Sequence, residues 1–176
     1  MILPMTKTVA RVRIEQRAIS LLDDPYFYNL GKAASERGGG WWCATVVAEI
    51  LKVPGIVERP WYPDKWPHDF YVELTERRGF PVMPLESDAR AGMVVAVFNG
   101  EYAVHYAILI DDYGTIVHAN GPEWTMNELE YEGKDNADRE LAFVQMDRIP
   151  IDPDTGLVDW PYRLVKFIDV LHGLEE

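Results

Sequence analysis

The chain has 176 residues, a length typical of one domain, and its 48% hydrophobic content suits a packed core rather than intrinsic disorder. Its 17 basic and 29 acidic residues give a net charge of −12, which argues against nucleic acid and anionic membranes as partners. A single cysteine, Cys43, excludes an intramolecular disulfide and any site built on several cysteines.

In the first half of the chain, apolar residues recur at helical spacing in three segments, residues 9–22, 42–51 and 68–78. The first helix is expected to stop at Pro25, the second at Pro54-Gly55 and the third at Gly79. Between the second and third, prolines alternate with Trp and Tyr, which predicts an ordered aromatic loop.

The second half changes to the pattern of strands. Apolar, β-branched and aromatic runs predict strands at residues 93–98, 103–110, 115–119 and 141–146, and Asp111–Gly114 predicts a hairpin turn. The spacing of Leu164, Ile168 and Leu171 predicts a closing helix over residues 160–171. We therefore expect an α+β fold in which N-terminal helices pack on a mostly antiparallel sheet, with an extra C-terminal helix.

Cys43 opens the second predicted helix, directly after a Gly-Gly-Gly-Trp-Trp segment. At a helix N-terminus a thiol faces unpaired backbone N–H groups and the positive end of the helix dipole, and both favour the thiolate. A thiolate is the nucleophile of acyl-transfer chemistry, and the same N–H groups suit a developing oxyanion. The alternative is that Cys43 is a small buried hydrophobe, which is the usual state of a free cysteine.

Two histidines lie on the strands of the predicted hairpin. If Ile110 faces Thr115 across the turn, Ala107 lies opposite His118 and His105 lies opposite Asn120. The histidines then share one face as diagonal neighbours, within reach of an imidazole–imidazole hydrogen bond. This register predicts His105 as the base that accepts the Cys43 proton and His118 as the group that orients it. A turn one residue longer or shorter would separate them.

Four segments follow one another along the chain: Cys43-Ala44-Thr45, Gly92-Met93-Val94-Val95, His105-Tyr106-Ala107-Ile108 and Ile116-Val117-His118-Ala119. This order of Cys, His and His, with the second histidine 13 positions after the first, resembles the NlpC/P60 superfamily of papain-like cysteine peptidases over about residues 12–148. The segment Trp61–Trp66 is similar to the one that follows the nucleophile helix in cell-wall peptidases of phage tails and gene transfer agents. Residues 150–176 then look like a C-terminal extension of a single domain spanning 1–176.

The resemblance implies hydrolysis of a D-γ-glutamyl bond to a diamino acid in peptidoglycan stem peptides, with catalytic residues Cys43, His105 and His118 and no cofactor. A family tyrosine that lines the oxyanion site has candidates in Tyr26 and Tyr28, although both lie further from Cys43 than in the family. The family's usual Asp-Cys-Ser-Gly is replaced by Trp42-Cys43-Ala44-Thr45 here. These departures bear on the identity of the substrate.

The same residues allow three other interpretations. A zinc site of Cys43, His105 and His118 lacks the short paired ligand spacing of structural zinc, so we expect no metal. A CHAP-type amidase would use Asn120 as its third group. A catalytically silent papain-like domain would instead dock on a phage-tail or secretion-apparatus protein.

The expected partner is a peptidoglycan peptide or another amide substrate, with neither nucleic acid nor membrane. No apolar run reaches the ~20 residues of a membrane-spanning helix, and the first residues show no secretion signal. We therefore expect a chain that is cytoplasmic as synthesised and is carried to a cell wall by a larger assembly.

Overall fold

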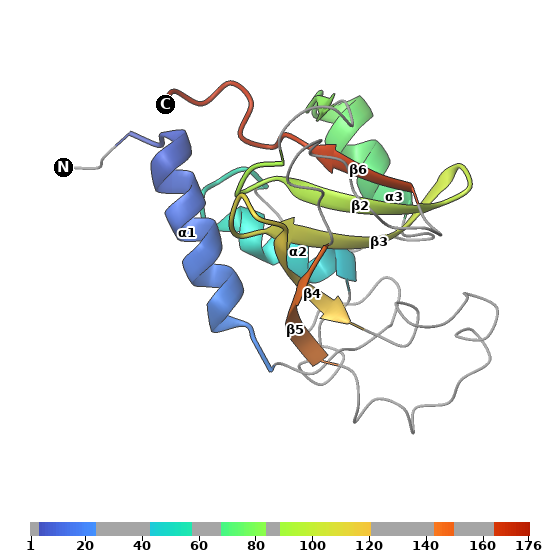
Figure 1. The fold of residues 1–176 in the computed structure, drawn as a ribbon. Coiled ribbons are helices and arrows are strands. Elements are labelled where there is room, and N and C mark those ends of the chain that lie inside the picture. Colours follow the sequence, from blue (N-terminus) through green and yellow to red (C-terminus); the bar gives the residue numbers. More distant parts are fainter. Residues whose placement is uncertain (1–3, 24–42, 58–67, 84–88, 121–142, 150–163) are drawn as a thin grey trace.

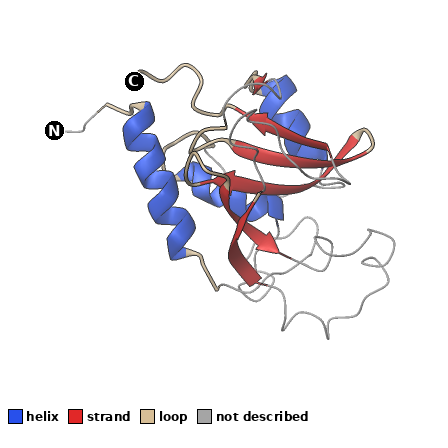
Figure 2. Cartoon of the chain, in the orientation of Figure 1, coloured by secondary structure: helices blue, strands red, loops and turns tan. Residues whose placement is uncertain are grey.

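The computed structural model describes residues 4–23, 43–57, 68–83, 89–120, 143–149 and 164–176. Within these ranges the helices are α1 (Lys7–Ser20), α2 (Cys43–Lys52) and α3 (His68–Val72), and α3 continues into a π-helical turn, η2 (Glu73–Arg77). The strands are β1 (Val82–Met83), β2 (Val94–Asn99), β3 (Tyr102–Leu109), β4 (Thr115–Asn120), β5 (Phe143–Arg148) and β6 (Leu164–Ile168). Helices and strands occupy separate stretches of the chain, so the predicted α+β class is confirmed (Figures 1 and 2).

The described strands form one six-stranded sheet in the order β1-β6-β2-β3-β4-β5. Every neighbouring pair is antiparallel, as the hairpin pattern predicted. In Figure 1, α2 lies against the far face of the sheet and α1 runs along its left side. Consecutive strands β3, β4 and β5 are neighbours, and these three strands position the candidate site.

The C-terminal segment differs from the prediction. Residues 164–168 form strand β6, which pairs with β1 on one side and β2 on the other, so the expected helix over 160–171 is wrong. Val165, Phe167 and Ile168 are buried while Leu164 is 45% exposed, a pattern that a helical face through Leu164 and Ile168 does not give. Between two partner strands, β-branched and aromatic residues gain more from the ladder than from a helix. β6 therefore belongs to the sheet itself and not to an appended helix.

The helices form where local spacing predicted them. The side chain of Thr6 caps α1 by accepting a hydrogen bond from the Val9 N–H, and Ala10, Ile14 and Ala18 bury one face of this helix. In α2, every residue of Cys43–Ala48 is buried, because this helix packs between α1 and strands β3 and β4. One buried cluster therefore joins the helices to the sheet, and a second, with Val95, Leu109 and Phe167, lies on the other side of the strands.

The β3–β4 hairpin has the predicted register. Ile108 lies opposite Val117 and Leu109 opposite Ile116, and the Ile110 N–H donates to the Thr115 carbonyl. The Asp111 carboxylate closes the turn by accepting hydrogen bonds from the Tyr113 and Thr115 N–H groups. The turn therefore has the length on which the alignment of the two histidines depends.

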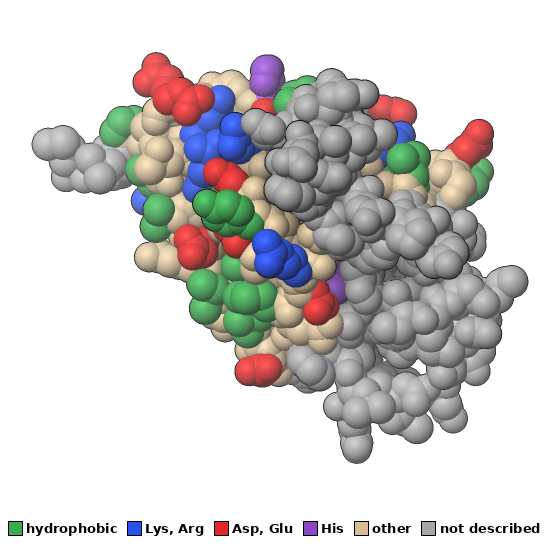
Figure 3. All heavy atoms as spheres, viewed as in Figure 1, with side chains coloured by type: hydrophobic (Ala, Val, Ile, Leu, Met, Phe, Trp, Pro, Cys, Tyr) green, Lys and Arg blue, Asp and Glu red, His purple; other side chains and the backbone are tan. Residues whose placement is uncertain are grey.

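The described ends of the chain lie together. The Lys7 N–H donates to the Glu175 carbonyl at 2.7 Å, and the Lys7 and Glu176 side chains form an ion pair, so the start of α1 lies near the C-terminus (Figure 1). On the face that Figure 3 shows, charged side chains of both signs are interspersed with hydrophobic ones. The exposed hydrophobic residues include Val12 and Ile19 of α1. In the part of the chain that the structure describes, no helix has the length and apolar character needed to span a bilayer.

Gly92 is expected to tolerate a side chain poorly. It has a φ of +91°, and an added Cβ would lie 2.8 Å from Cδ1 of the buried Leu171. Gly92→Ala should therefore lower the free energy of unfolding by about 2–4 kcal/mol, from backbone strain and overpacking together. Gly55→Ala, at φ +77° with nothing within 4 Å, supplies the strain alone and should cost about 1–2 kcal/mol. Urea denaturation measures the free energy of unfolding of both variants. Equal losses would contradict a clash between the added Cβ and Leu171.

Candidate active site

Three neighbouring strands bring polar side chains together on one face. His105 lies on β3, His118 on β4, and Gln145 and Asp147 on β5. Across the β4–β5 ladder His118 is opposite Gln145, and Ile116 is opposite Asp147, so Asp147 is the diagonal neighbour of His118. Both histidines are completely buried, which is unusual for a titratable side chain that has no role beyond packing.

The two imidazoles are in hydrogen-bond contact. Nε2 of His105 lies 2.8 Å from Nδ1 of His118, and the rings meet edge to face with centroids 5.0 Å apart. The diagonal contact that the hairpin register predicted is therefore confirmed. The catalytic roles that the sequence suggested for these histidines stay predictions.

The row of contacts continues onto β5. Nε2 of His118 lies 2.6 Å from Oδ2 of Asp147, and the side-chain amide of Gln145 donates a hydrogen bond to the same oxygen. The hydrogen bond with His118, joined by that from Gln145, holds the pKa of the Asp147 carboxyl below its ordinary value, against the opposing effect of partial burial. Asp147 is therefore ionised near neutral pH and faces the imidazole of His118 as an anion.

Cys43 occupies the position that the sequence predicted, as the first residue of α2. Its exposed fraction is 1%, and α2 packs against both β3 and β4. Burial, followed by the nearby charge of an ionised Cys43, raises the pKa of Tyr106 well above its ordinary value, and the Tyr106 hydroxyl accepts a hydrogen bond from the Tyr71 N–H. The thiol therefore lies within electrostatic reach of Tyr106, which follows His105 in β3.

The other predicted site residues fall largely outside the described part of the chain. Tyr26 and Tyr28, the oxyanion candidates, lie outside it, as does the aromatic segment Trp61–Trp66. Asn120 is the last residue of β4, opposite Phe143, and its side chain is not among those described. Among the described residues, no cluster of three or more His, Cys, Asp or Glu side chains is arranged to hold a metal ion.

Sequence reasoning missed Asp147 and Gln145. The predicted strand over 141–146 stopped one residue before Asp147, whereas β5 extends to Arg148. Alternation along that strand would have put Gln145 and Asp147 on one face, but only the β4–β5 pairing shows that this face meets His118. That pairing joins segments more than twenty residues apart in the chain and has no local signal.

Comparison with known proteins gives a match of fold. The structure superimposes on the P60 domain of the M. avium subspecies paratuberculosis antigen MAP1204 with a TM-score of 0.57 and 14% sequence identity, over 92% of this chain and 95% of that one. No family model and no curated protein matches the sequence. The chain therefore has the α+β fold of a P60 domain, as the resemblance implied.

Proposed function

From the P60 fold and the paired histidines, we propose that this chain is a cysteine peptidase that forms a thioester on Cys43. The observation that carries the proposal is the buried contact between His105 and His118 on neighbouring strands. A second imidazole beside the base is the arrangement of a nucleophile–base–orienter triad. The start of α2 at Cys43 supports the thiol as the nucleophile, because backbone N–H groups and the helix dipole favour a thiolate there.

The proposed chemistry has two halves. His105 accepts the proton of Cys43, the thiolate attacks the carbonyl carbon, and the oxyanion lies near the first N–H groups of α2. As the C–N bond breaks, His105 returns the proton to the leaving amine, and a thioester remains on Cys43. Water then attacks the thioester, His105 accepts its proton, and the thiol is restored as the carboxylic acid leaves.

The proposed substrate is a peptidoglycan stem peptide, cleaved between D-γ-glutamate and the diamino acid. The support is the resemblance of the motifs around Cys43, His105 and His118 to NlpC/P60 peptidases, together with the P60 fold. The resemblance of Trp61–Trp66 to phage-tail peptidases makes this bond the first to test. For the third group of the triad, the contact between the two imidazoles favours His118 over the Asn120 of a CHAP-type amidase.

The pH dependence of Cys43 alkylation tests the proposal without a substrate. Because the chain has one cysteine, the rate of reaction with iodoacetamide reports one site. We expect a midpoint well below the ~8.5 of a free thiol in the native protein, and a higher midpoint in His105→Ala, because the imidazolium that stabilises the thiolate is then missing.

The matched control is His172→Ala, which removes an exposed imidazole near the C-terminus and should leave the midpoint unchanged. The triad would be overturned by a thiol that reacts only when the protein unfolds. It would also be overturned by an alkylation midpoint that is the same in His105→Ala as in the native protein. The catalytically silent docking domain would then be the better interpretation.

A further inference from the structure

Asp147 ends the row of side chains that begins at His105. Its Oδ2 lies 2.6 Å from Nε2 of His118 and also accepts the hydrogen bond from Gln145. Among the described residues, His118 is the ionisable group in hydrogen-bond contact with this carboxylate. Arg148 follows it in β5, and strand alternation directs that side chain to the opposite face of the sheet.

An ionised carboxylate accepts hydrogen bonds and cannot donate them, so Nε2 of His118 must carry a proton. In neutral His118 the other nitrogen, Nδ1, then has a lone pair and accepts the hydrogen bond across the 2.8 Å contact. Nε2 of His105 must therefore be the donor. By the same rule, Nδ1 of neutral His105 has a lone pair, which is what a base needs.

We propose that Asp147 is a positioning residue that sets the direction of this hydrogen-bond row and so keeps Nδ1 of His105 unprotonated and ready to accept the Cys43 proton. The role of His105 as the base rests on the proposed function. The reverse direction needs a proton on Nδ1 of both histidines, and His105 could then accept no proton at that nitrogen. When His105 becomes an imidazolium, the same carboxylate stabilises it through His118.

Substitutions at Asp147 separate its role as an acceptor from its charge. Gln145 and Nε2 of His118 contact the same oxygen of Asp147, so in Asp147→Asn the carbonyl oxygen can accept both hydrogen bonds, which keeps the direction of the row but removes the charge. Asp147→Leu removes the acceptor that holds the proton on Nε2 of His118, so the protons of both histidines can move to Nδ1. Asp147→Glu keeps a carboxylate and should keep the original direction.

The ring ¹⁵N resonances of the full-length protein, labelled at histidine, measure the tautomers directly. We expect Nε2–H tautomers at His105 and His118 in the native chain, in Asp147→Asn and in Asp147→Glu, and a population of Nδ1–H tautomers in Asp147→Leu. The midpoint of Cys43 alkylation in Asp147→Asn should rise by about one pH unit, or tenfold less thiolate below the midpoint. A structural role alone would not move the protons from one nitrogen to the other.

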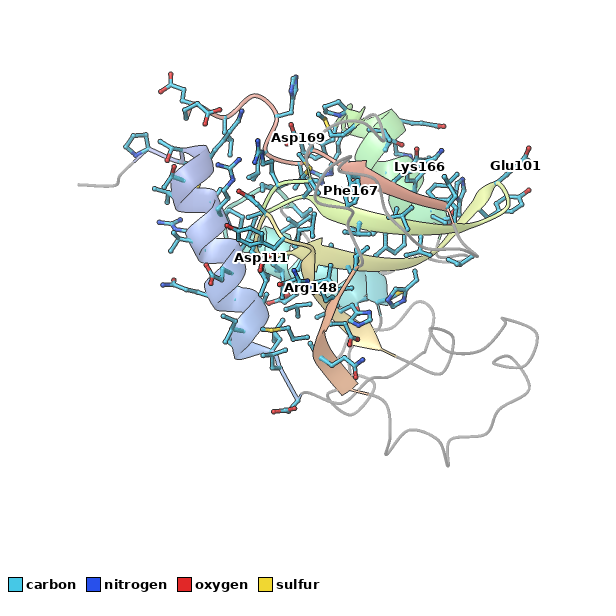
Figure 4. The ribbon with its side chains drawn as sticks, in the orientation of Figure 1. Glu101, Asp111, Arg148, Lys166, Phe167 and Asp169 are labelled. Atoms are coloured by element: carbon cyan, nitrogen blue, oxygen red, sulfur yellow. The ribbon has the colours of Figure 1, made fainter. Side chains whose placement is uncertain are left out.

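Glu101→Gln is the matched control, since it removes the same charge at the β2–β3 turn, far from β5 and its Arg148 (Figure 4). It should change neither the tautomers nor the midpoint. Asp147→Asn, which keeps an acceptor but loses the charge, serves if Asp147→Leu fails to fold, and should raise the midpoint because the imidazolium of His105 is then less stabilised.

The two proposals fail separately. If His105→Ala moves the alkylation midpoint while Asp147→Leu leaves both the tautomers and the midpoint as they were, the role of Asp147 is overturned and the peptidase proposal stands. If substitution of Asp147 changes the tautomers but the Cys43 alkylation midpoint changes with neither His105 nor Asp147, the proposed direction of the row is supported and the peptidase proposal is wrong.

Discussion

Cys43→Ala is expected to abolish hydrolysis of stem peptides that contain the D-γ-glutamyl-diaminopimelate bond, with a loss in kcat of about 10⁴-fold or more. The variant removes the only thiol of the chain, so no thioester can form. The loss is measured by monitoring, with chromatography and mass spectrometry, the release of the product that carries the free amine of the diamino acid. Because alanine replaces a small buried side chain, the fold should survive with a loss of about 1 kcal/mol.

Tyr113→Ala is the control, since Tyr113 is 73% exposed on the β3–β4 turn and should retain wild-type rates. Hydrolysis that survives Cys43→Ala would place the nucleophile elsewhere in the chain. If the native protein leaves stem peptides intact while its Cys43 alkylation midpoint is low and depends on His105, this substrate class is wrong. The proposed thiol chemistry would still stand.

Phe167→Ala is expected to give the largest loss of stability among single substitutions in β6, about 3–5 kcal/mol. Phe167, labelled in Figure 4, is 1% exposed and lies opposite Met83 of β1 and Val95 of β2. It belongs to the buried cluster on its face of the sheet, so truncation leaves a cavity in that cluster. Urea denaturation measures the loss in the free energy of unfolding, and the m-value should be the same in the variant as in the native protein.

Leu164→Ala in the same strand is the control, because Leu164 is 45% exposed and should cost less than about 1 kcal/mol. Equal losses at Leu164 and Phe167 would contradict the position of β6 between β1 and β2. A helix over 160–171 would instead have made Leu164 a core residue.

Local patterns predicted the helices and the hairpin well. The apolar spacing of Ile14 and Ala18 marks the buried face of α1, and α2 begins at Cys43 as expected. These elements depend on contacts within one helix or one turn, and the sequence displays those contacts directly. The same holds for Asp111–Gly114, where side-chain hydrogen bonds fix the length of the turn and thus the register of His105 and His118.

Where partners come from distant segments, prediction failed or stopped short. The apolar residues of 164–171 have the spacing of a helix but the composition of a strand. The hydrogen bonds and packing that β6 gains between β1 and β2 favour the strand. Nothing in the sequence around Asp147 distinguishes it from other polar strand residues, and only the pairing of β5 with β4 brings it to His118.

Spacing within short segments was sufficient to predict a nucleophile candidate at a helix start and the contact of the two hairpin histidines, and the order of these segments predicted the α+β class. The pairing of distant strands established that β6 enters the sheet and that Asp147 completes the row of His105 and His118. The physical reason is that strand pairing between remote segments is settled by the burial and hydrogen bonding of the whole sheet, which no single segment encodes.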